Sequence, residues 1–284
     1  MVGVDRIKVG IIGTGYTVGI AKAHVEAYKN NHRVEIAGLY DIVPGRAAEW
    51  AEKNSLEGVR ICSSLEELFS LVDAVSICTP NHTHVDLTIK AIEAGKHVLC
   101  EKPLSTSFEE AKKATECLKQ HPDIVAMIGF NYRDTPAIKY IKQIIDEGKL
   151  GTIYTYRHEL GGNRIANPKD VKLEWRMQEQ LSGTGALADF GSHMLDLADY
   201  LLSSSHGKFV EVGAMVNTFI KERTVIDGEQ KGIVTNDDCA VFNAIMESGT
   251  LLSFVSSRLG VPSAILEIVG EGGMLIYNGR SNQL

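Results

Sequence analysis

Short apolar runs alternate with segments of helical periodicity over the first part of the chain. The apolar runs are rich in β-branched residues and lie at 7–12, 34–40, 74–78, 97–100 and 124–128. Continuous apolar runs of this length are typical of strands covered on both faces of a sheet. Helical patterns separate them, at 20–30, 46–53, 65–71, 85–94 and 108–120. This order predicts an α/β fold with a doubly wound parallel sheet and right-handed crossovers.

Local signals at the helix ends agree with these boundaries. Ser64 and Ser107 each stand three residues before a glutamate, which is the pattern of a capping box. Pro44 suits a first-turn position, and Gly95 suits a helix C-terminus.

The pattern changes after about residue 130. A helix is predicted at 137–147 and a strand at 153–160, followed by a polar loop at 161–185 and a helix at 190–202. Strands without intervening helices follow at 209–221, 239–246, 250–257, 264–269 and 274–277. Such a succession favours an α+β domain with a mostly antiparallel, open sheet. We therefore expect two domains, at 1–130 and 131–284.

Composition removes several classes of function. Lys and Arg total 29 and Asp and Glu total 36, a net charge of −7, and no basic cluster is present. Nucleic acid and anionic membranes are therefore not expected as partners. No apolar run approaches the roughly 20 residues that span a bilayer, and the N-terminus carries no signal-peptide pattern. Five widely spaced cysteines without a C-x-x-C pair are typical of reduced thiols in a cytoplasmic protein.

The first strand leads directly into a glycine-rich turn that opens a helix. Glycine permits the tight turn and lets backbone N–H groups approach a pyrophosphate, while the helix N-terminus adds partial positive charge. The third glycine comes one place late, so we expect a longer loop than the standard one. The expected contacts with the dinucleotide are Gly13, Gly15, Tyr16 and Thr17.

The second strand ends in Asp41, at about the expected distance for the acidic residue that binds the adenosine ribose. A carboxylate there accepts hydrogen bonds from ribose hydroxyls and repels a 2′-phosphate, so NAD is expected over NADP. Arg46 lies close enough to soften that preference. The alternative is that Asp41, shortly before Pro44, is a turn residue.

Several longer motifs resemble the Gfo/Idh/MocA family, named after glucose–fructose oxidoreductase, inositol dehydrogenase and a rhizopine-catabolism enzyme. They are SICTPNHTH at 76–84, AGKHVLCEKPL at 94–104, GFNYR at 129–133, WR at 175–176 and GTGALADFGSH at 183–193. The Glu-Lys-Pro element and the downstream Asp-x-Gly-x-His are the specific ones. The resemblance covers nearly the whole chain.

The resemblance implies an NAD(P)-binding Rossmann domain, a second α/β domain whose open sheet forms dimers or tetramers, and oxidation or reduction of sugars, polyols or related carbonyl compounds. It implies catalytic roles for Lys102, Asp189 and His193. Positions lining the cofactor are Thr79, Pro80, Asn81, His84, Glu101, Lys102, Trp175 and Arg176. Candidates for substrate contacts are Lys102, Tyr132, Arg133, Asp189 and His193.

Two features depart from the family pattern. The shifted glycine leaves the pyrophosphate contacts open. The chain also stops at Leu284, where family members usually continue with further strands and a helix, so we expect a truncated chain in which the segment 274–277 is frayed or paired with another chain.

The residue types suit hydride transfer from a secondary alcohol, which needs a base for the hydroxyl proton and a positive group for the developing alkoxide. Asp189 and His193 are four apart, so on a helix they share a face and the carboxylate can orient the imidazole. Lys102 follows a parallel strand, at the edge where open α/β sheets bind ligands.

Each of these residues also has an ordinary interpretation. Asp189 and His193 could be a helix cap and its neighbour, Lys102 a solvated strand end, and Tyr132 and Trp175 core aromatics. A metal held by His82 and His84, or by Asp189 and His193, lacks a third ligand at suitable spacing, so no metal is expected.

Three functions remain in competition. The first is an NAD-dependent dehydrogenase or reductase for a sugar or cyclitol. The second is a glycosidase of the same fold that oxidises its substrate transiently, with no net redox change. The third is a dinucleotide-sensing regulator without chemistry. The sequence leaves the substrate and the physiological direction open.

Overall fold

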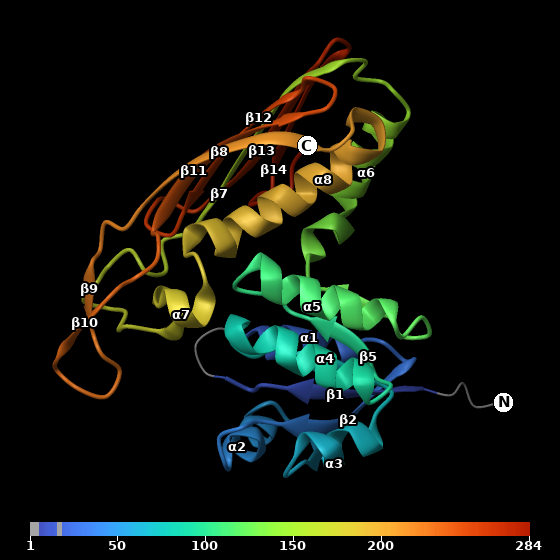
Figure 1. The fold of residues 1–284 in the computed structure, drawn as a ribbon, viewed down its shortest axis with the longest axis vertical. Helices are drawn as coiled ribbons and strands as arrows, with labels where there is room; N and C mark the ends of the chain where they lie inside the picture. The colour runs from blue at the N-terminus through green and yellow to red at the C-terminus, as the bar shows by residue number, and fades with distance from the viewer. Residues whose placement is uncertain (1–5, 16–18) are drawn as a thin grey trace. The chain divides into compact units, whose positions relative to one another are not determined.

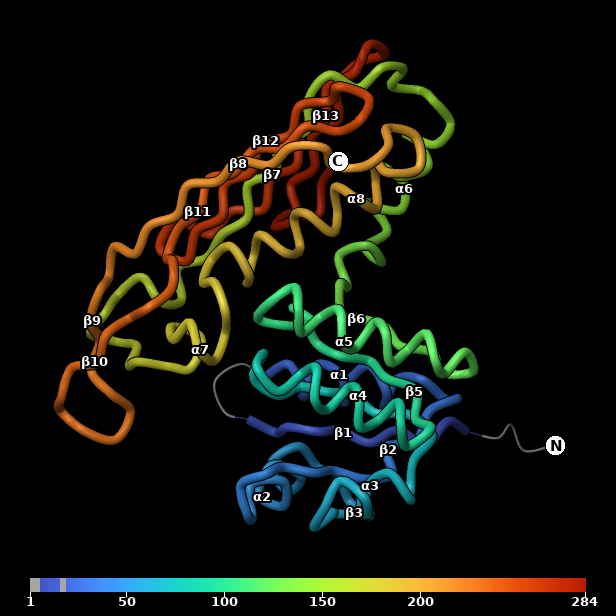
Figure 2. The backbone as a smooth tube through the Cα atoms, viewed as in Figure 1, coloured from blue at the N-terminus to red at the C-terminus, as the bar shows by residue number. Residues whose placement is uncertain are grey.

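Two units, Met1–Gly129 and Phe130–Leu284, make up the chain, each built on its own sheet (Figures 1 and 2). A computed structural model describes residues 6–15 and 19–284. Within these ranges no helix is both long enough and apolar enough to cross a membrane.

The sheet of the first unit has six parallel strands in the order β3-β2-β1-β4-β5-β6. The strands are β1 (Ile7–Ile12), β2 (Val34–Tyr40), β3 (Arg60–Ile61), β4 (Ala74–Ile77), β5 (His97–Cys100) and β6 (Ala126–Ile128). The strand order reverses between β1 and β4. Open sheets of this kind bind ligands outside the carboxyl ends of the strands at such a reversal. The predicted doubly wound sheet is therefore confirmed.

Helices cover both faces of this sheet. The helices are α1 (Ile20–Lys29), α2 (Arg46–Lys53), α3 (Leu65–Leu71), α4 (His84–Glu93) and α5 (Phe108–Lys119), with a 3₁₀ turn η1 (Asn81–Thr83). Alternate strand residues divide between two cores, so that Ile11 packs with α1 and α2 while Ile12 packs with α3 and α4. Burial of apolar residues on both faces explains the nearly unbroken apolar runs.

Most of the local signals behave as predicted. The hydroxyls of Ser64 and Ser107 accept hydrogen bonds from the backbone N–H groups of Glu67 and Glu110, at 3.1 and 3.3 Å. Gly95 follows α4 with a φ of +72°. Pro44 is the exception: α2 begins at Arg46 with Gly45 as its N-cap, so Pro44 precedes the helix. The short, exposed strand β3 has no apolar run and was not predicted.

The second unit has a mixed, mostly antiparallel sheet in the order β14-β13-β7-β12-β11-β8, in which only β7 and β12 pair in parallel among the described strands. The strands are β7 (Ile153–Gly161), β8 (Phe209–Asn217), β11 (Cys239–Met246), β12 (Leu251–Ser257), β13 (Ser263–Gly270) and β14 (Gly273–Asn278). The expected α+β architecture is confirmed.

Two helices, α6 (Pro136–Asp146) and α8 (Ser192–His206), cover one face of this sheet (Figure 1). Their apolar sides, with Ile141 and Leu201 fully buried, pack on Tyr156, Phe242 and Phe254 from the strands. The alternating burial of β11 and β12 follows from this one-sided cover.

The segments around the sheet differ from the prediction. The expected strand 209–221 ends at Asn217, and the chain continues into a separate hairpin of β9 (Glu222–Thr224) and β10 (Lys231–Ile233). The loop at 161–185 contains a 3₁₀ turn η3 (Trp175–Met177) and a short helix α7 (Glu179–Ser182).

The segment 274–277 is not frayed, because β14 pairs with β13 along its length. A further 3₁₀ turn, η2 (Asn131–Asp134), leads into α6.

Candidate active site

The glycine turn after β1 lies against the loop after β4, at the reversal of strand order. Gly13 has a φ of +94°, and a Cβ on it would meet Thr79 Cγ2 at 2.6 Å and Thr79 N at 3.0 Å. Gly15 faces open space instead, with nothing within 4 Å of the position of a Cβ. Both features suit a dinucleotide site, since Gly13 permits the tight turn and Gly15 leaves room for the ligand. Tyr16 and Thr17 lie outside the described residues.

The Asp41 carboxylate joins the glycine turn to the end of β2. Its Oδ2 accepts hydrogen bonds from Thr14 N and Thr14 Oγ1, both at 2.8 Å. Its Oδ1 accepts from Val43 N at 3.0 Å and lies 3.3 Å from Arg46 Nη1. The side chain is only 3% exposed. Asp41 thus makes the turn contact that the sequence left as its alternative, and its binding of ribose stays a prediction.

His84 braces the two loops that flank the predicted cofactor edge. Its imidazole is 1% exposed, with Nδ1 2.7 Å from the carbonyl oxygen of Pro103 and Nε2 2.8 Å from that of Thr79. Burial lowers the pKa of this imidazole. Any contribution of His84 to cofactor binding therefore passes through the loops that it connects. Pro80 and Asn81 stand in the first of these loops, as N-cap and first residue of η1.

Glu101 and Lys102 follow β5 at the same carboxyl edge. The Glu101 side chain, 12% exposed, lies 2.8 Å from His24 Nε2 and also accepts a 3.3 Å hydrogen bond from Lys102 N. His24 Nδ1 in turn lies 3.1 Å from Ser76 Oγ. The Lys102–Pro103 peptide bond is cis. Sequence reasoning missed His24 and Ser76. The signal that could have identified them is a polar residue in an otherwise apolar position, on the buried face of α1 for His24 and within β4 for Ser76.

In the second unit, Asp189 lies on a π-helical turn, η4 (Leu187–Gly191), which runs directly into α8. Asp237 holds the start of this turn. Its Oδ1 and Oδ2 accept hydrogen bonds from Gly185 N at 2.5 Å and Leu187 N at 2.8 Å. π-Turns inside helices are frequent at functional sites. The predicted helix from 190 therefore begins earlier and with a different winding.

His193 lies one turn further on, buried among aromatic rings. It stacks on Tyr132 with centroids 4.3 Å apart and an interplanar angle of 16°, and it meets Phe130 edge-on at 5.7 Å. Burial, and next the charge of Asp189, raise the pKa of the Tyr132 phenol. Asp189 and His193 therefore both face Tyr132, as expected for residues four apart on one helix face.

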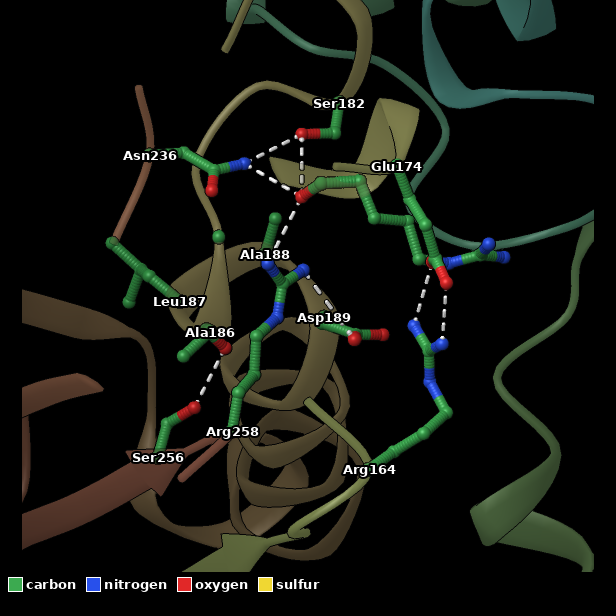
Figure 3. A network of polar contacts seen from close by, with 12 residues as sticks. Arg164, Glu174, Ser182, Ala186, Leu187, Ala188, Asp189, Asn236, Ser256 and Arg258 are labelled. Carbon is green, nitrogen blue, oxygen red and sulfur yellow. Dashed lines mark hydrogen bonds and ion pairs between the residues drawn. The ribbon is translucent and has the colours of Figure 1, made fainter. Parts of the chain in front are cut away.

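Arginines surround the Asp189 carboxylate (Figure 3). Arg258 Nη2 lies 3.4 Å from Asp189 Oδ2. Arg164 makes a two-pronged ion pair with Glu174, at 2.8 and 2.9 Å. Arg176 stacks on Trp175 at 4.2 Å, and burial lowers the pKa of its guanidinium. Arg164, Arg176, Arg258 and Asp189 line one small cavity with Phe190 and Met177.

Arg133, a candidate substrate contact, is fastened to α8. Its guanidinium donates to both carboxylate oxygens of Asp196, with Nε 2.8 Å from Oδ2, and lies 5.3 Å from the centre of the Tyr200 ring. The arrangement anchors η2, and with it Tyr132, against the helix that carries His193. Its role towards a substrate stays a prediction.

Asn236, Asp237 and Arg258 are site residues that sequence reasoning missed. Asn236 Nδ2 donates to the carbonyl oxygen of Arg176 at 2.8 Å and to Ser182 Oγ at 2.7 Å. The available signal was a polar run, Thr-Asn-Asp-Asp, directly before an apolar strand. Across the described residues, no group of three or more His, Cys, Asp or Glu side chains could hold a metal ion.

Comparison with known proteins places the chain in a family. Residues 7–130 match the family model described as an oxidoreductase family with an NAD-binding Rossmann fold, and residues 138–276 match the GFO/IDH/MocA C-terminal domain. Levoglucosan dehydrogenase from Pseudarthrobacter phenanthrenivorans is 34% identical over 96% of this chain and 74% of its own length. Glucose-6-phosphate 3-dehydrogenase from Bacillus subtilis is 29% identical over 93% of this chain and 72% of its own.

Solved structures agree. Levoglucosan dehydrogenase in complex with NADH superposes with a TM-score of 0.88 at 32% identity, covering 97% of this chain and 74% of that one. The turn at Gly13, the open position at Gly15 and the loop after β4 fit an NAD dinucleotide at the edge of the first sheet. The chain therefore belongs to the GFO/IDH/MocA oxidoreductase family and is an NAD-dependent dehydrogenase whose first unit is the NAD-binding Rossmann domain.

Proposed function

We propose that this enzyme oxidises a secondary hydroxyl on the ring of a sugar or cyclitol and transfers the hydride to NAD. The observation that carries the proposal is the placement of His193, whose ring is held flat against Tyr132 on the helix face shared with Asp189. Relatives named for levoglucosan, glucose 6-phosphate and inositol support this substrate class.

His193 takes the hydroxyl proton in oxidation and returns it in reduction. An imidazole suits both directions because its ordinary pKa lies near neutral pH. The stack on Tyr132 and the edge contact with Phe130 limit the rotation of the ring. Asp189 acts through the imidazole, which it orients and makes more basic.

Lys102 holds the substrate oxygen and stabilises the negative charge that develops on it. The ammonium group suits that charge better than a neutral donor does. Its backbone N–H donates to the Glu101 carboxylate, which also forms a hydrogen bond with His24. The backbone from which the lysine side chain extends is therefore fixed.

The nicotinamide of bound NAD accepts the hydride. The residues that would hold the dinucleotide are Gly13, Gly15 and Asp41 at the ends of β1 and β2, and Thr79, Pro80 and Asn81 after β4. Trp175 and Arg176 are further candidates on the second unit.

The test is a panel of levoglucosan, D-glucose, glucose 6-phosphate, a methyl glucoside and myo-inositol with NAD, read as NADH absorbance. Steady NADH accumulation with at least one of these is expected. Release of an aglycone without net NADH would support a glycosidase instead, and turnover of none of these or of other sugars and cyclitols would contradict the proposal.

Variants then assign the roles. Lys102→Ala and His193→Ala should each lower kcat by about 10²–10⁴, the range for a positioned acid–base group, while NADH binding stays within a few-fold. Asp189→Asn should lower kcat by the same factor or a smaller one. In the double variant of Asp189→Asn and His193→Ala, the two effects on kcat should be less than additive. Near-normal single-turnover rates and an unchanged pH profile in His193→Ala would place the base elsewhere.

We also propose that the protein self-associates through the uncovered face of the second sheet. Met215, Val241 and Val255 are direct cross-strand neighbours on β8, β11 and β12, and they are 72%, 41% and 41% exposed. An apolar row of this kind on a sheet face is typical of an interaction surface.

A further inference from the structure

Arg258 is a buried cation placed at the edge of the proposed catalytic pair. It directly follows β12, and its side chain is 7% exposed. Nη2 lies 3.4 Å from Asp189 Oδ2, and Nη1 donates a 3.0 Å hydrogen bond to the carbonyl oxygen of Arg176 (Figure 3). A guanidinium this deep in a protein needs a carboxylate nearby, since burial of a charge is otherwise costly.

The surroundings hold Arg258 in this position. Its backbone N–H donates to the carbonyl oxygen of Asp238 at 2.9 Å. The carbonyl oxygen of Arg176 that it binds is also held by Asn236 Nδ2 at 2.8 Å. Both the main chain and the guanidinium of Arg258 are therefore fixed before any substrate binds.

The charged and titratable groups recorded near Asp189 come from four segments of the second unit. Arg258 follows β12, Arg176 belongs to η3, Arg164 to the loop after β7 and Tyr132, on which His193 stacks, to η2. Arg164 is already paired with Glu174 through two hydrogen bonds. Arg258 makes an ion pair with Asp189.

We propose that Arg258 is a positioning residue for the reaction: it fixes the Asp189 carboxylate and offsets part of its negative charge, which limits how strongly that carboxylate favours the protonated form of His193. This proposal rests on the function proposed above. Asp189 alone would favour the imidazolium, since an adjacent anion stabilises the protonated ring. A cation paired with that anion moderates the effect.

The charge and the hydrogen bond of Arg258 can be separated by two substitutions. Arg258→Gln is neutral but keeps an N–H donor for the carbonyl oxygen of Arg176, whereas Arg258→Lys keeps the charge. The readout is the titration midpoint of the His193 ring, followed by NMR of protein labelled at histidine, with the resonance assigned by its loss in His193→Gln. This measurement needs neither cofactor nor substrate.

In Arg258→Gln the midpoint of His193 should rise by about one pH unit, and in Arg258→Lys it should stay within about 0.3 unit of the wild type. An unchanged midpoint in Arg258→Gln would overturn the proposal. Arg60→Met is the control, because it removes an arginine whose ion pair with Glu67 lies on the surface of the first unit and should leave His193 unchanged. Thermal unfolding of each variant verifies folding, and Arg258→Met replaces Arg258→Gln if the latter does not fold.

Kinetics separates this inference from the proposed function. With the substrate found in the panel, the acid limb of kcat/KM for oxidation should move to higher pH in Arg258→Gln by the same amount as the midpoint. A shifted midpoint with an unmoved acid limb would leave Arg258 as the residue that sets the His193 charge and would contradict His193 as the base. NADH affinity should stay within a few-fold, whereas a tenfold or larger loss would identify Arg258 as a ligand of the cofactor and overturn the positioning role.

Discussion

At the scale of single residues, several side chains of the site form hydrogen bonds to backbone atoms of neighbouring loops. Asp41 holds Thr14, His84 holds Thr79 and Pro103, and Glu101 holds Lys102. Each of these hydrogen bonds holds a loop of the predicted site in position. Asp41, His84 and Glu101 therefore have a structural role in addition to any contact with a ligand. Hydrogen bonds to an ionised acceptor contribute about 1.5–3 kcal/mol each, so the carboxylates of Asp41 and Glu101 are costly to replace.

Asp41→Ala should therefore weaken the binding of both dinucleotides. It removes two hydrogen bonds to Thr14 as well as the proposed ribose acceptor, so we expect at least about tenfold weaker NADH binding and a smaller preference for NADH over NADPH. Fluorescence titration with both cofactors measures this. Asp73→Ala is a matched control, since Asp73 also accepts a 2.8 Å hydrogen bond from a backbone N–H, that of Lys8, but directly before β4. Equal affinity of the unmodified protein for NADPH would contradict the assignment.

A second residue-scale prediction concerns His158. This histidine on β7 is 4% exposed, and burial lowers its pKa from 6.5 to about 4. The unfolded chain therefore takes up a proton near pH 6.5 and the folded chain does not, so the free energy of unfolding falls between pH 6.5 and about 4. The loss is about 3 kcal/mol in total. His158→Gln should remove this part of the pH dependence, as measured by urea unfolding at pH 7 and pH 4.5. Parallel losses in both proteins would contradict the prediction.

At the scale of elements, the turn η4 depends on a backbone crossing that admits only glycine. A Cβ at Gly185 would lie 1.8 Å from the carbonyl oxygen of Asp237, which itself accepts a hydrogen bond from Ala186 N at 2.9 Å. The start of the helix that carries Asp189 and His193 is therefore packed directly on the segment before β11.

Gly185→Ala should displace that start. We expect a loss of about 3 kcal/mol or more in stability, together with a fall in kcat, because backbone atoms cannot move aside as a flexible side chain can. Gly213→Ala is the control, since nothing lies within 4 Å of a Cβ at Gly213 on β8. A Gly185→Ala protein with unchanged thermal midpoint and activity would show that the crossing is looser than described.

At the scale of the whole molecule, one sheet is covered on both faces and the other on one. The second sheet leaves the row formed by Met215, Val241 and Val255 exposed, while its other face carries the core under α6 and α8. Exposure of such a row is unfavourable in water, which is the physical reason for the self-association proposed above.

The double change Val241→Asp and Val255→Asp should therefore convert a dimer or larger assembly into monomers, as seen by light scattering after size-exclusion chromatography. Phe108→Asp serves as the control, because Phe108 is 77% exposed on α5 in the first unit and outside this row. A monomeric unmodified protein would refute the proposal directly.

The sequence by itself determined most of the long helices and strands and the class of cofactor. Parallel strands that are buried on both faces are nearly all apolar, so β1, β2 and β5 could be predicted from short local runs of sequence, and a serine cap acts within three residues. The glycine turn after β1 is equally local. The Glu-Lys-Pro and Asp-x-Gly-x-His motifs located the candidate lysine, aspartate and histidine by resemblance.

Only the tertiary structure decided what those residues touch. Asp41 binds a residue 27 positions away, and Glu101 binds one 77 positions away. No period or local propensity encodes such pairs, because they depend on which strands become neighbours. The same holds for Arg258, which has no motif and becomes a partner of Asp189 because β12 ends beside η4. The π-turn at η4 was likewise unpredictable, since its winding follows from the hydrogen bonds that Asp237 makes to Gly185 and Leu187.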